Sequence, residues 1–482
     1  MHWIDLSIFI VYMIAMLGIG YYFLKRNKST DDFYVGGRSM GAGHVGLSVV
    51  ATDVGGGFSI GLGGLGFAIG ISGSWMLFTG LLGAWLAGVF LVPLVYKLGV
   101  KHNFHTFPQA LNFFFDKRVA MIAGIISGIG YIGFTSSQVL AGAKLASATF
   151  IDLNLNTALV FMGIVAVVYT VMGGLKAVIY TDTVQWIILI AGLTLIGIPI
   201  AGNAVGGWSA VKETLPTEFL QFDNITWQRA VKWVVTILPI WFVGMTLYQR
   251  IYASKNAKTA RRAWFLAGIF EYPFMAFMGV ILGMFARVAF ENGMFVEWGY
   301  NFGGDVDVEM GLPIVLRNTL PVGLMGLMMS AYFSAIMSTA DSCLMAASGN
   351  LLSDIGMKLF KVDLKGKKLL RASQLVTLLI GVLAILIALN LQNVLELMLY
   401  SYAFMVSGLF IPVLVALIYK KPNAPAAIVA MLGGGSMTVA LTFFEKLPFD
   451  LDANVFGLIF SAILYFSLHY ILKSKGKRPA YG

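Results

Sequence analysis

The sequence predicts an all-helical integral membrane protein that forms one transmembrane domain over residues 1–482. Hydrophobic residues make up 58% of the chain and charged residues only 12%, whereas a soluble domain usually carries about 25% charged residues. Apolar stretches of about 20 residues, the length that crosses a bilayer, follow one another along the chain and are separated by short polar loops. The mean hydropathy of +0.82 leaves little room for a large soluble domain.

We expect about 13 transmembrane helices, each an apolar run between polar loops. The predicted spans are 5–24, 44–70, 74–97, 119–148, 156–173, 176–202, 230–249, 264–289, 321–350, 371–390, 393–418, 424–445 and 452–472. In the first of them the positive residues follow the apolar run, which is the reverse of the order in a signal peptide. Residues 311–320, in a loop, are expected to form a short surface helix.

The distribution of positive charge predicts how these helices cross the membrane. With the spans above, 26 of the 33 Lys and Arg residues fall on one side. They lie in loops near 25–38, 97–118, 176, 250–262, 358–371 and 420–421 and in the tail from 473. Because positive residues concentrate in cytoplasmic loops, we expect an outside N-terminus and a cytoplasmic C-terminus in the plasma (inner) membrane. Lys144 and Arg287, near outer span ends, are expected to snorkel to the surface.

Several other function classes are disfavoured by the residues. The net charge of +10 is explained by topology, so no nucleic-acid partner is expected. A single cysteine, Cys343, excludes a multi-cysteine metal site, and no two of the five histidines lie four residues apart on an apolar helix. We therefore expect a transporter rather than an enzyme. An ion channel is a remote alternative, because a channel would not need broken helices.

Acidic residues inside predicted spans are the first candidates for function, because a charge in the hydrocarbon costs about 3 kcal/mol or more. Three stand out: Asp53, Asp182 and Asp341. Asp53 lies in the stretch ATDVGGG, residues 51–57, whose three consecutive glycines are poor helix formers. An unwound stretch at this depth must face protein or water, and discontinuous helices of this kind build the sites of secondary transporters.

The glycines that follow favour a different role. Gly61, Gly63, Gly64 and Gly66 are expected to allow close packing against a neighbouring helix. Pro239 and Gly244 interrupt the span that begins near 230, and would give a second half of the chain its own broken helix.

Asp341 follows a stripe of hydroxyl groups. Helical spacing places Ala335, Ser338, Thr339 and Ser342 on one face, and Asp341 borders that face. Hydroxyl and carboxylate oxygens suit a hard cation, so the stripe predicts a cation site. The position of Asp182 alone does not decide between a functional acid and an interfacial partner of Lys176.

Four motifs in the expected order resemble the sodium/solute symporter family, which includes carriers of proline, sugars, sialic acid, choline and pantothenate. They are DFYVGGRS at 32–39, GGLKAVIYTDTVQ at 173–185, Gln249-Arg250 followed by 260–263, and AIMSTADS at 335–342. The resemblance covers nearly the whole chain. It implies two inverted five-helix repeats of the leucine-transporter type, about 44–202 and 230–418, with one peripheral helix before them (5–24) and two after (424–445 and 452–472).

The resemblance also implies alternating access and sodium as the coupling ion. The principal sodium site would use carbonyls of Ala51, Val54 and Ala335 and hydroxyls of Ser338 and Thr339. A second sodium, bound by some members, would fall on Asp182, Ser338, Asp341 and Ser342. Asp341 replaces a serine of the family pattern, so this position could hold sodium or a proton.

The solute is less well defined by the sequence. The pocket should be lined by the unwound stretch, the next span, the span from 230 and one polar residue at 138: Thr52, Asp53, Gly55, Gly56, Phe58, Trp75, Phe78, Gln138, Trp241, Phe242 and Thr246. Asp53 favours a small solute that bears a positive charge, such as an amino acid or another amine. The alternatives are a sodium-coupled sugar, sialic acid or monocarboxylate carrier, and more remotely a proton-coupled carrier.

Overall fold

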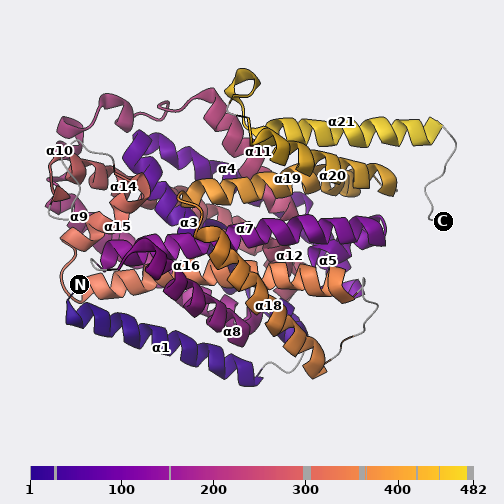
Figure 1. Ribbon diagram of the computed structural model, residues 1–482, viewed down its shortest axis with the longest axis horizontal. Coiled ribbons are helices and arrows are strands. Elements are labelled where there is room, and N and C mark those ends of the chain that lie inside the picture. The colour runs from indigo at the N-terminus through magenta and orange to yellow at the C-terminus, as the bar shows by residue number, and fades with distance from the viewer. Residues whose placement is uncertain are drawn as a thin grey trace.

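The structure is a bundle of long helices that run mostly along one axis of the molecule (Figure 1). This computed structural model describes residues 2–26, 30–150, 153–296, 306–357, 364, 366–419, 422–444 and 446–474. Within those residues the only β-type pairing is a bridge between Met40 and Ser254. Two backbone hydrogen bonds of 3.0 Å accompany it, from Met40 N to the Ala253 carbonyl and from Lys255 N to the Met40 carbonyl. The all-helical prediction is therefore confirmed.

The helices of the N-terminal half are α1 (Trp3–Arg26), α2 (Thr30–Val35), α3 (Ala42–Ile69), α4 (Trp75–Phe90), α5 (Val92–His102), α6 (Phe107–Phe114), α7 (Lys117–Thr149), α8 (Leu155–Gly192), α9 (Ile198–Ala204) and α10 (Gly207–Thr214). Those of the C-terminal half are α11 (Trp227–Val243), α12 (Met245–Ala253), α13 (Ala257–Ile269), α14 (Ala276–Glu291), α15 (Val308–Thr319), α16 (Leu324–Gly349), α18 (Gly366–Ala388), α19 (Val394–Ile418), α20 (Ala424–Leu441) and α21 (Ala453–Ser474).

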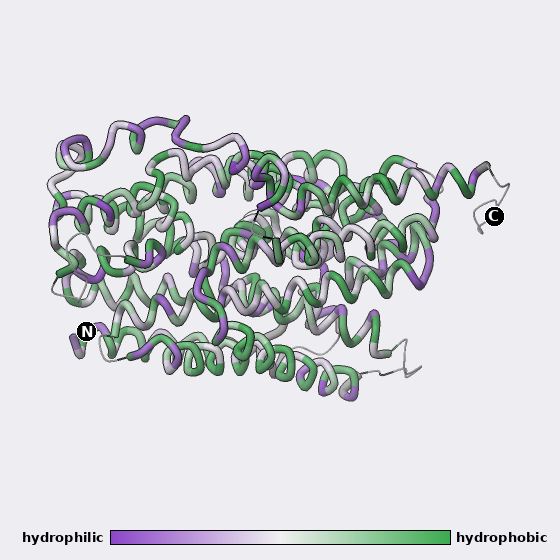
Figure 2. Tube along the Cα trace, turned by 45° about the horizontal axis from the view of Figure 1, so that its top comes forward, coloured by the Kyte–Doolittle hydropathy of each residue, from purple (hydrophilic) through white to green (hydrophobic). Residues whose placement is uncertain are grey.

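Many of these helices are long and apolar enough to cross a membrane. Among the described residues, eight helical stretches meet this criterion, and the bent pair α11–α12 makes a ninth. Two shorter apolar stretches, Trp3–Ile19 within α1 and Leu155–Val171 within α8, fall below the required length. Hydrophobic residues follow the helices, and hydrophilic ones are most frequent near the ends and in the connecting segments (Figure 2). The chain is a multi-pass membrane protein, while the count of 13 stays a prediction.

The long helix α8 contains a reversal of the chain. Tyr169 Oη and Thr181 Oγ1 lie 3.3 Å apart, although twelve residues of straight helix would separate their backbones by about 18 Å. The chain must therefore turn back between them. This agrees with the predicted division into two spans at 156–173 and 176–202.

Three spans are interrupted near their middle. In α3, Gly55 has a left-handed φ of 48° with ψ of −172°, a conformation that favours glycine. The helices α11 and α12 meet at Gly244 with a bend of 42°. Between α13 and α14 lies a widened turn, Phe270–Met275, in which Tyr272 is extended at φ −137° and ψ 121°. These breaks free backbone groups inside the bundle and position the candidate site.

The helix expected at 311–320 is present as α15, but it does not lie on the surface. Its residues Gly311–Leu316 are buried. Lys144 of α7 is also buried, because its Nζ pairs at 2.6 Å with both Asp307 and Glu309. The expectation that Lys144 snorkels is wrong for this reason: its charge is matched inside the protein. The Glu309 carboxylate also accepts hydrogen bonds from the backbone N–H groups of Val394 and Leu395 at the start of α19.

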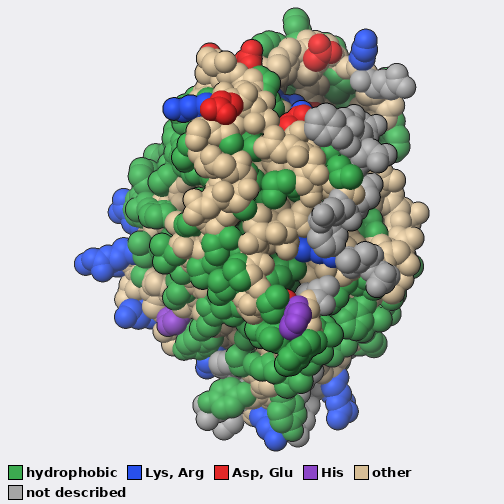
Figure 3. Space-filling view, turned by 90° about the vertical axis from the view of Figure 1, so that its left-hand side faces the viewer, with side chains coloured by type: hydrophobic (Ala, Val, Ile, Leu, Met, Phe, Trp, Pro, Cys, Tyr) green, Lys and Arg blue, Asp and Glu red, His purple; other side chains and the backbone are tan. Residues whose placement is uncertain are grey.

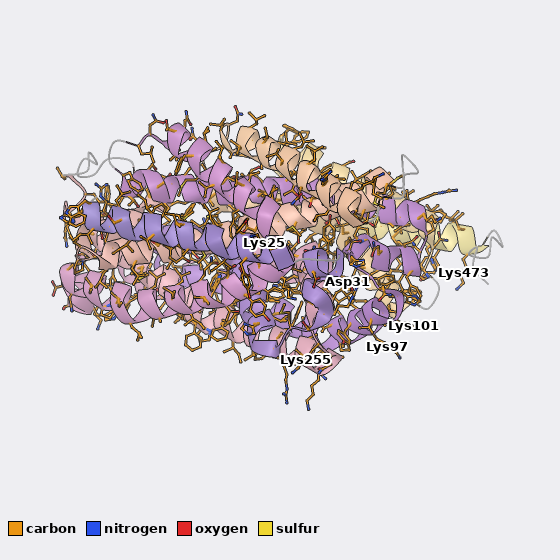
Figure 4. All side chains as sticks on the ribbon, turned by 90° about the horizontal axis from the view of Figure 1, so that it is seen from below. Lys25, Asp31, Lys97, Lys101, Lys255 and Lys473 are labelled. Atoms are coloured by element: carbon orange, nitrogen blue, oxygen red, sulfur yellow. The ribbon has the colours of Figure 1, made fainter. Side chains whose placement is uncertain are left out.

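Charged side chains lie at both ends of the bundle. Lys97, Lys101 and Lys473 lie toward the end where α21 finishes (Figure 4), and the opposite end has acidic and basic side chains along its upper edge (Figure 3). Near the lysines, Asp31 accepts a hydrogen bond of 3.1 Å from Arg38 Nε and contacts His105. Burial raises the pKa of Asp31, but the bonds and charges of His105 and Arg38 outweigh this effect and leave it below its usual value.

Close helix contacts are made at the glycines that were expected to serve packing. A Cβ atom on Gly66 would lie 2.8 Å from Cα of Val280, and one on Gly63 would lie 2.8 Å from Cβ of Leu312. The helices α14 and α15 therefore approach α3 where it has no side chain, as close membrane-helix packing requires.

We predict that Gly66→Ala lowers the free energy of unfolding in detergent by about 1–3 kcal/mol, because the added methyl group meets the backbone of Val280 rather than a movable side chain. Gly43→Ala is the matched control, since nothing lies within 4 Å of its added Cβ. Thermal unfolding of both variants measures the difference. Equal melting temperatures would show that α14 can move away at no cost.

Candidate functional site

The break in α3 lies against the hydroxyl stripe of α16. The Thr339 hydroxyl lies 2.8 Å from the Ala51 carbonyl and 3.2 Å from the Ala335 carbonyl. The Ser338 hydroxyl is 3.2 Å from the same Ala335 oxygen. All four residues are buried. The structure therefore brings together, from two helices, four of the five residues expected at the principal sodium site.

The fifth residue, Val54, directly precedes the left-handed Gly55 and is fully buried. A Cβ atom on Gly55 would lie 2.9 Å from Cγ2 of Thr339, so the broken backbone and α16 are in close contact there. Carbonyl and hydroxyl oxygens are the donors that a hard cation prefers. The chemistry of this cluster fits sodium, and no charged side chain is needed for it.

A second cluster lies beside the first and is centred on Asp182. The Asp182 carboxylate accepts hydrogen bonds from Ser48 and, at 3.4 Å, from Arg250 Nη2. The same guanidinium nitrogen donates to Ser342 Oγ at 2.8 Å, and Ser338 lies next to Asp182. Asp182 is thus a buried functional candidate and not an interfacial partner of Lys176, which instead lies 3.6 Å from Asp32.

Asp341 completes this cluster from α16. One carboxyl oxygen accepts a hydrogen bond from Thr170 of α8. The other, Oδ2, has no hydrogen-bond partner among the described residues, and the same holds for Oδ1 of Asp182. Two neighbouring buried carboxylates therefore present free oxygens, and together with Ser338 and Ser342 they make up the set expected for a second cation.

Asp53 points away from these clusters toward α19 and the break between α13 and α14. Its Oδ1 accepts a hydrogen bond of 3.3 Å from Tyr402 Oη, and its carboxyl group lies beside that of Glu271. Nearby, Tyr131 Oη lies 3.0 Å from Thr246 Oγ1 at the bend between α11 and α12. The three broken spans thus contribute to one polar centre.

The remaining predicted solute contacts are distributed around this centre. Trp75 and Phe78 stack edge to face at 5.1 Å, and Phe78 packs on Tyr272 at 5.3 Å, so they cover the break next to Glu271. Trp241 is fully buried on α11, and Phe242 packs on Phe410 at 5.9 Å.

Four other predicted contacts face α16 or lie outside the described side chains. Thr52 lies 3.2 Å from Ser342 Oγ, so it belongs to the second cluster. Gly56 packs against Ile336, whose Cβ would be 2.7 Å from an added Cβ. Gln138 lies among residues of α8 and α16, including Met162 and Ile336. The side chain of Phe58 is not among those described.

Two buried charged residues were missed by the sequence analysis. Glu271 lies in the middle of the predicted span 264–289, so the rule that selected Asp53 would also have found it. Arg250 was assigned to a cytoplasmic loop, but it is fully buried, because Asp182 and two serines satisfy its guanidinium. The position of Arg250 at the end of a predicted span did not indicate that its side chain is buried. Tyr131 and Tyr402 carried no distinctive pattern.

Broken membrane helices that meet at oxygen-lined clusters define an ion-coupled secondary transporter. The chain belongs to the sodium:solute symporter family, whose profile matches residues 33–434. Sodium is therefore its coupling ion, and the resemblance seen in the sequence is confirmed.

Known proteins similar to this chain include two bacterial carriers. The high-affinity proline transporter PutP of Bacillus subtilis is 28% identical, over 93% of this chain and 96% of the relative. The sodium/glucose cotransporter of Vibrio parahaemolyticus is 24% identical, over 96% of this chain and 89% of the relative. Their different solutes mean that membership of the family does not identify the solute of this chain.

Solved structures share the fold. A Na+-coupled sialic acid symporter in a substrate-bound outward-open state superposes with a TM-score of 0.80, at 22% identity and 98% coverage of both chains. The nucleobase-cation-symport-1 family transporter MHP1 superposes with a TM-score of 0.55, at 15% identity over 92% of this chain and 95% of its own. These similarities confirm an all-helical fold of the leucine-transporter type.

We predict that Asp182 and Arg250 are energetically coupled. Asp182→Asn leaves a buried guanidinium without a counter-charge and should lower the free energy of unfolding by about 3 kcal/mol or more. Adding Arg250→Gln should recover part of that loss. A double-mutant cycle of unfolding in detergent measures the coupling, and strictly additive effects would contradict it.

Proposed function

We propose that this symporter couples inward sodium movement to the uptake of a small polar solute with an amine group, by alternating access. The observation that carries the proposal is the Thr339 hydroxyl of α16, which lies within hydrogen-bond distance of the carbonyls of both Ala51 on α3 and Ala335 on α16, beside the break in α3. Sodium bound at Ala51, Val54, Ala335, Ser338 and Thr339 would hold α3 against α16. The solute-facing residues that follow on α3 would then be fixed in position.

The coupling follows from this shared backbone. Asp53 lies between the two proposed carbonyl ligands Ala51 and Val54, so an ion that orders these carbonyls also orders Asp53. Sodium and solute must then raise each other's affinity by the same factor. At a membrane potential of about 100 mV, each inward positive charge adds about 2.3 kcal/mol of driving force.

We propose Asp182, Ser338, Asp341 and Ser342 as the second cation site. The free oxygens of Asp182 and Asp341 support it. Asp341 could accept sodium or a proton, because a carboxyl group serves both, and the choice decides whether a second sodium moves in each cycle.

The solute pocket is proposed to lie around Asp53, with Thr52, Gly55, Gly56, Phe58, Trp75, Phe78, Gln138, Trp241, Phe242 and Thr246 as further lining residues. Asp53 supports a solute with a positive group. A sugar, sialic acid or monocarboxylate is the alternative, in view of the glucose and sialic acid carriers among the similar proteins.

The topology we propose has 13 spans, an outside N-terminus and a cytoplasmic C-terminus. The core would consist of inverted repeats at about 44–202 and 230–418, with peripheral helices 5–24, 424–445 and 452–472. Two observations support it: the first span of each repeat is the broken one, α3 and α11–α12, and Lys97, Lys101 and Lys473 lie toward one end (Figure 4).

We predict that Ser338→Ala lowers sodium-driven uptake at least tenfold in proteoliposomes, because the principal site loses a hydroxyl ligand. Ser330→Ala is the matched control on the same helix, since among the described residues its hydroxyl bonds only to the Gly326 carbonyl one turn away. Uptake would be measured for labelled amino acids, amines, glucose, sialic acid and monocarboxylates under sodium, potassium and proton gradients. Equal loss in both variants would refute the proposed site.

In the same assay, Asp341→Asn distinguishes sodium binding from proton binding at the second site. If Asp341 binds sodium, the Hill coefficient for sodium falls toward one while uptake of the solute continues. If it carries a proton, the sodium dependence is unchanged and the proton gradient loses its effect. A variant with unaltered sodium and proton dependence would exclude Asp341 from coupling.

A further inference from the structure

Glu271 is a fully buried carboxyl group with no evident structural partner. It lies in the break between α13 and α14 and packs against Gly80 of α4, where an added Cβ would be 2.7 Å from the Glu271 carboxyl carbon. Apart from the contact with Asp53, neither of its oxygens has a hydrogen-bond partner among the described residues. A buried carboxylate without a partner is costly, so its presence here requires an explanation.

The Asp53 carboxyl group that it faces is in the same situation. Asp53 is 3% exposed, and its Oδ2 has no hydrogen-bond partner in the described part of the chain. Three acceptor oxygens therefore converge: Oδ2 of Asp53 and both oxygens of Glu271. We call Asp53 and Glu271 the carboxyl pair.

No cation among the described residues is paired with Asp53 or Glu271. Neither residue belongs to any of the ion pairs found among the described residues. Arg250, the buried cation that serves the neighbouring cluster, is committed to Ser48, Thr246, Ser342 and Asp182. When both carboxyl groups are ionised, no cation among the described residues balances their charge, and a bound cation would do so.

The groups around the pair suit an organic cation. Tyr402 donates to Asp53, and Tyr131 lies close enough to both Asp53 and Tyr402 to interact electrostatically. Trp241 packs against Gly83 of α4, and Glu271 packs against Gly80 of the same helix. Residues three apart share one helix face, so Trp241 and Glu271 contact the same face of α4. Aromatic faces attract cations with an organic body.

The acceptors also discriminate between kinds of cation. A primary ammonium has three N–H donors, which equals the number of free oxygens in the carboxyl pair, and a guanidinium has five. A quaternary ammonium has no donor and would leave all three oxygens unsatisfied. Within this cluster no basic side chain is free to hold a solute carboxylate, because Arg250 is committed.

We infer that the carboxyl pair of Asp53 and Glu271 binds the ammonium or guanidinium group of a solute that has a net positive charge and no carboxylate. This inference rests on the proposed function, since it names the class of the transported solute. Glu271 is then a specificity-determining residue that doubles the negative charge facing the solute.

Binding to the purified full chain tests this with compounds on one four-carbon frame: putrescine, aminobutyrate and butanediol, together with agmatine and choline. Thermal stabilisation would be titrated with each, in sodium and in potassium. We expect putrescine and agmatine to bind at least tenfold tighter than aminobutyrate, butanediol and choline. Glu271→Gln should reduce that preference by about tenfold or more, because one charge partner is lost.

Glu396→Gln is the matched control, an exposed acid on α19 that bonds Tyr400 outside the cluster, and it should keep the preference. If Glu271→Gln does not fold, Asp53→Asn provides the same comparison. Preferential binding of the zwitterion or the diol, or a cation preference that survives Glu271→Gln, overturns the inference. These overturning outcomes include the case in which the carboxyl pair holds only a proton or a sodium ion.

The two proposals fail in different ways. A cation preference that is lost in Glu271→Gln but is equal in sodium and potassium upholds the solute class and contradicts sodium coupling at the proposed site. Binding that depends on sodium, but favours a neutral or zwitterionic solute, upholds coupling and contradicts the solute class.

Discussion

The contact between the broken helix α3 and the hydroxyl stripe of α16 is the constraint on which the rest of the structure depends. Gly55 turns the chain out of helical geometry, directly after Val54 and one turn after Ala51. Thr339 of α16 supplies a hydroxyl to the Ala51 carbonyl. In a bilayer, where water cannot satisfy such a carbonyl, α3 is stable in this form only while α16, or an ion, lies beside it.

The sequence predicts the architecture well, because its signals are local. Span length, glycine runs and the stripe from Ala335 to Ser342 are visible in single segments, and the structure brings Ala51, Ala335, Ser338 and Thr339 together as expected. That Asp341 and Asp182 belong to one cluster was implied by the family resemblance rather than by spacing, and the two carboxyl groups do lie close enough to interact electrostatically. The family fold is confirmed, whereas the solute contacts stay predictions.

What the sequence could not predict depends on contacts between distant segments. Arg250 looks like a loop residue until Asp182, 68 positions away, is seen to balance its charge. Lys144 looks like a snorkelling lysine until Asp307 and Glu309 are placed beside it. Glu271 was visible as an acid in a span, but only the fold shows that it faces Asp53. Burial of charge is decided by partners, and a hydropathy pattern contains no information about partners.

The backbone bridge at Met40 has a consequence for how the protein can move. It links the segment just before α3 to the end of α12 by two main-chain hydrogen bonds, so these two ends of the broken spans are fastened to each other. Any rearrangement that leaves these bonds intact must move both ends together. Because main-chain atoms make the link, most side-chain replacements there would leave both hydrogen bonds in place. The connection between the two broken spans therefore tolerates changes in sequence.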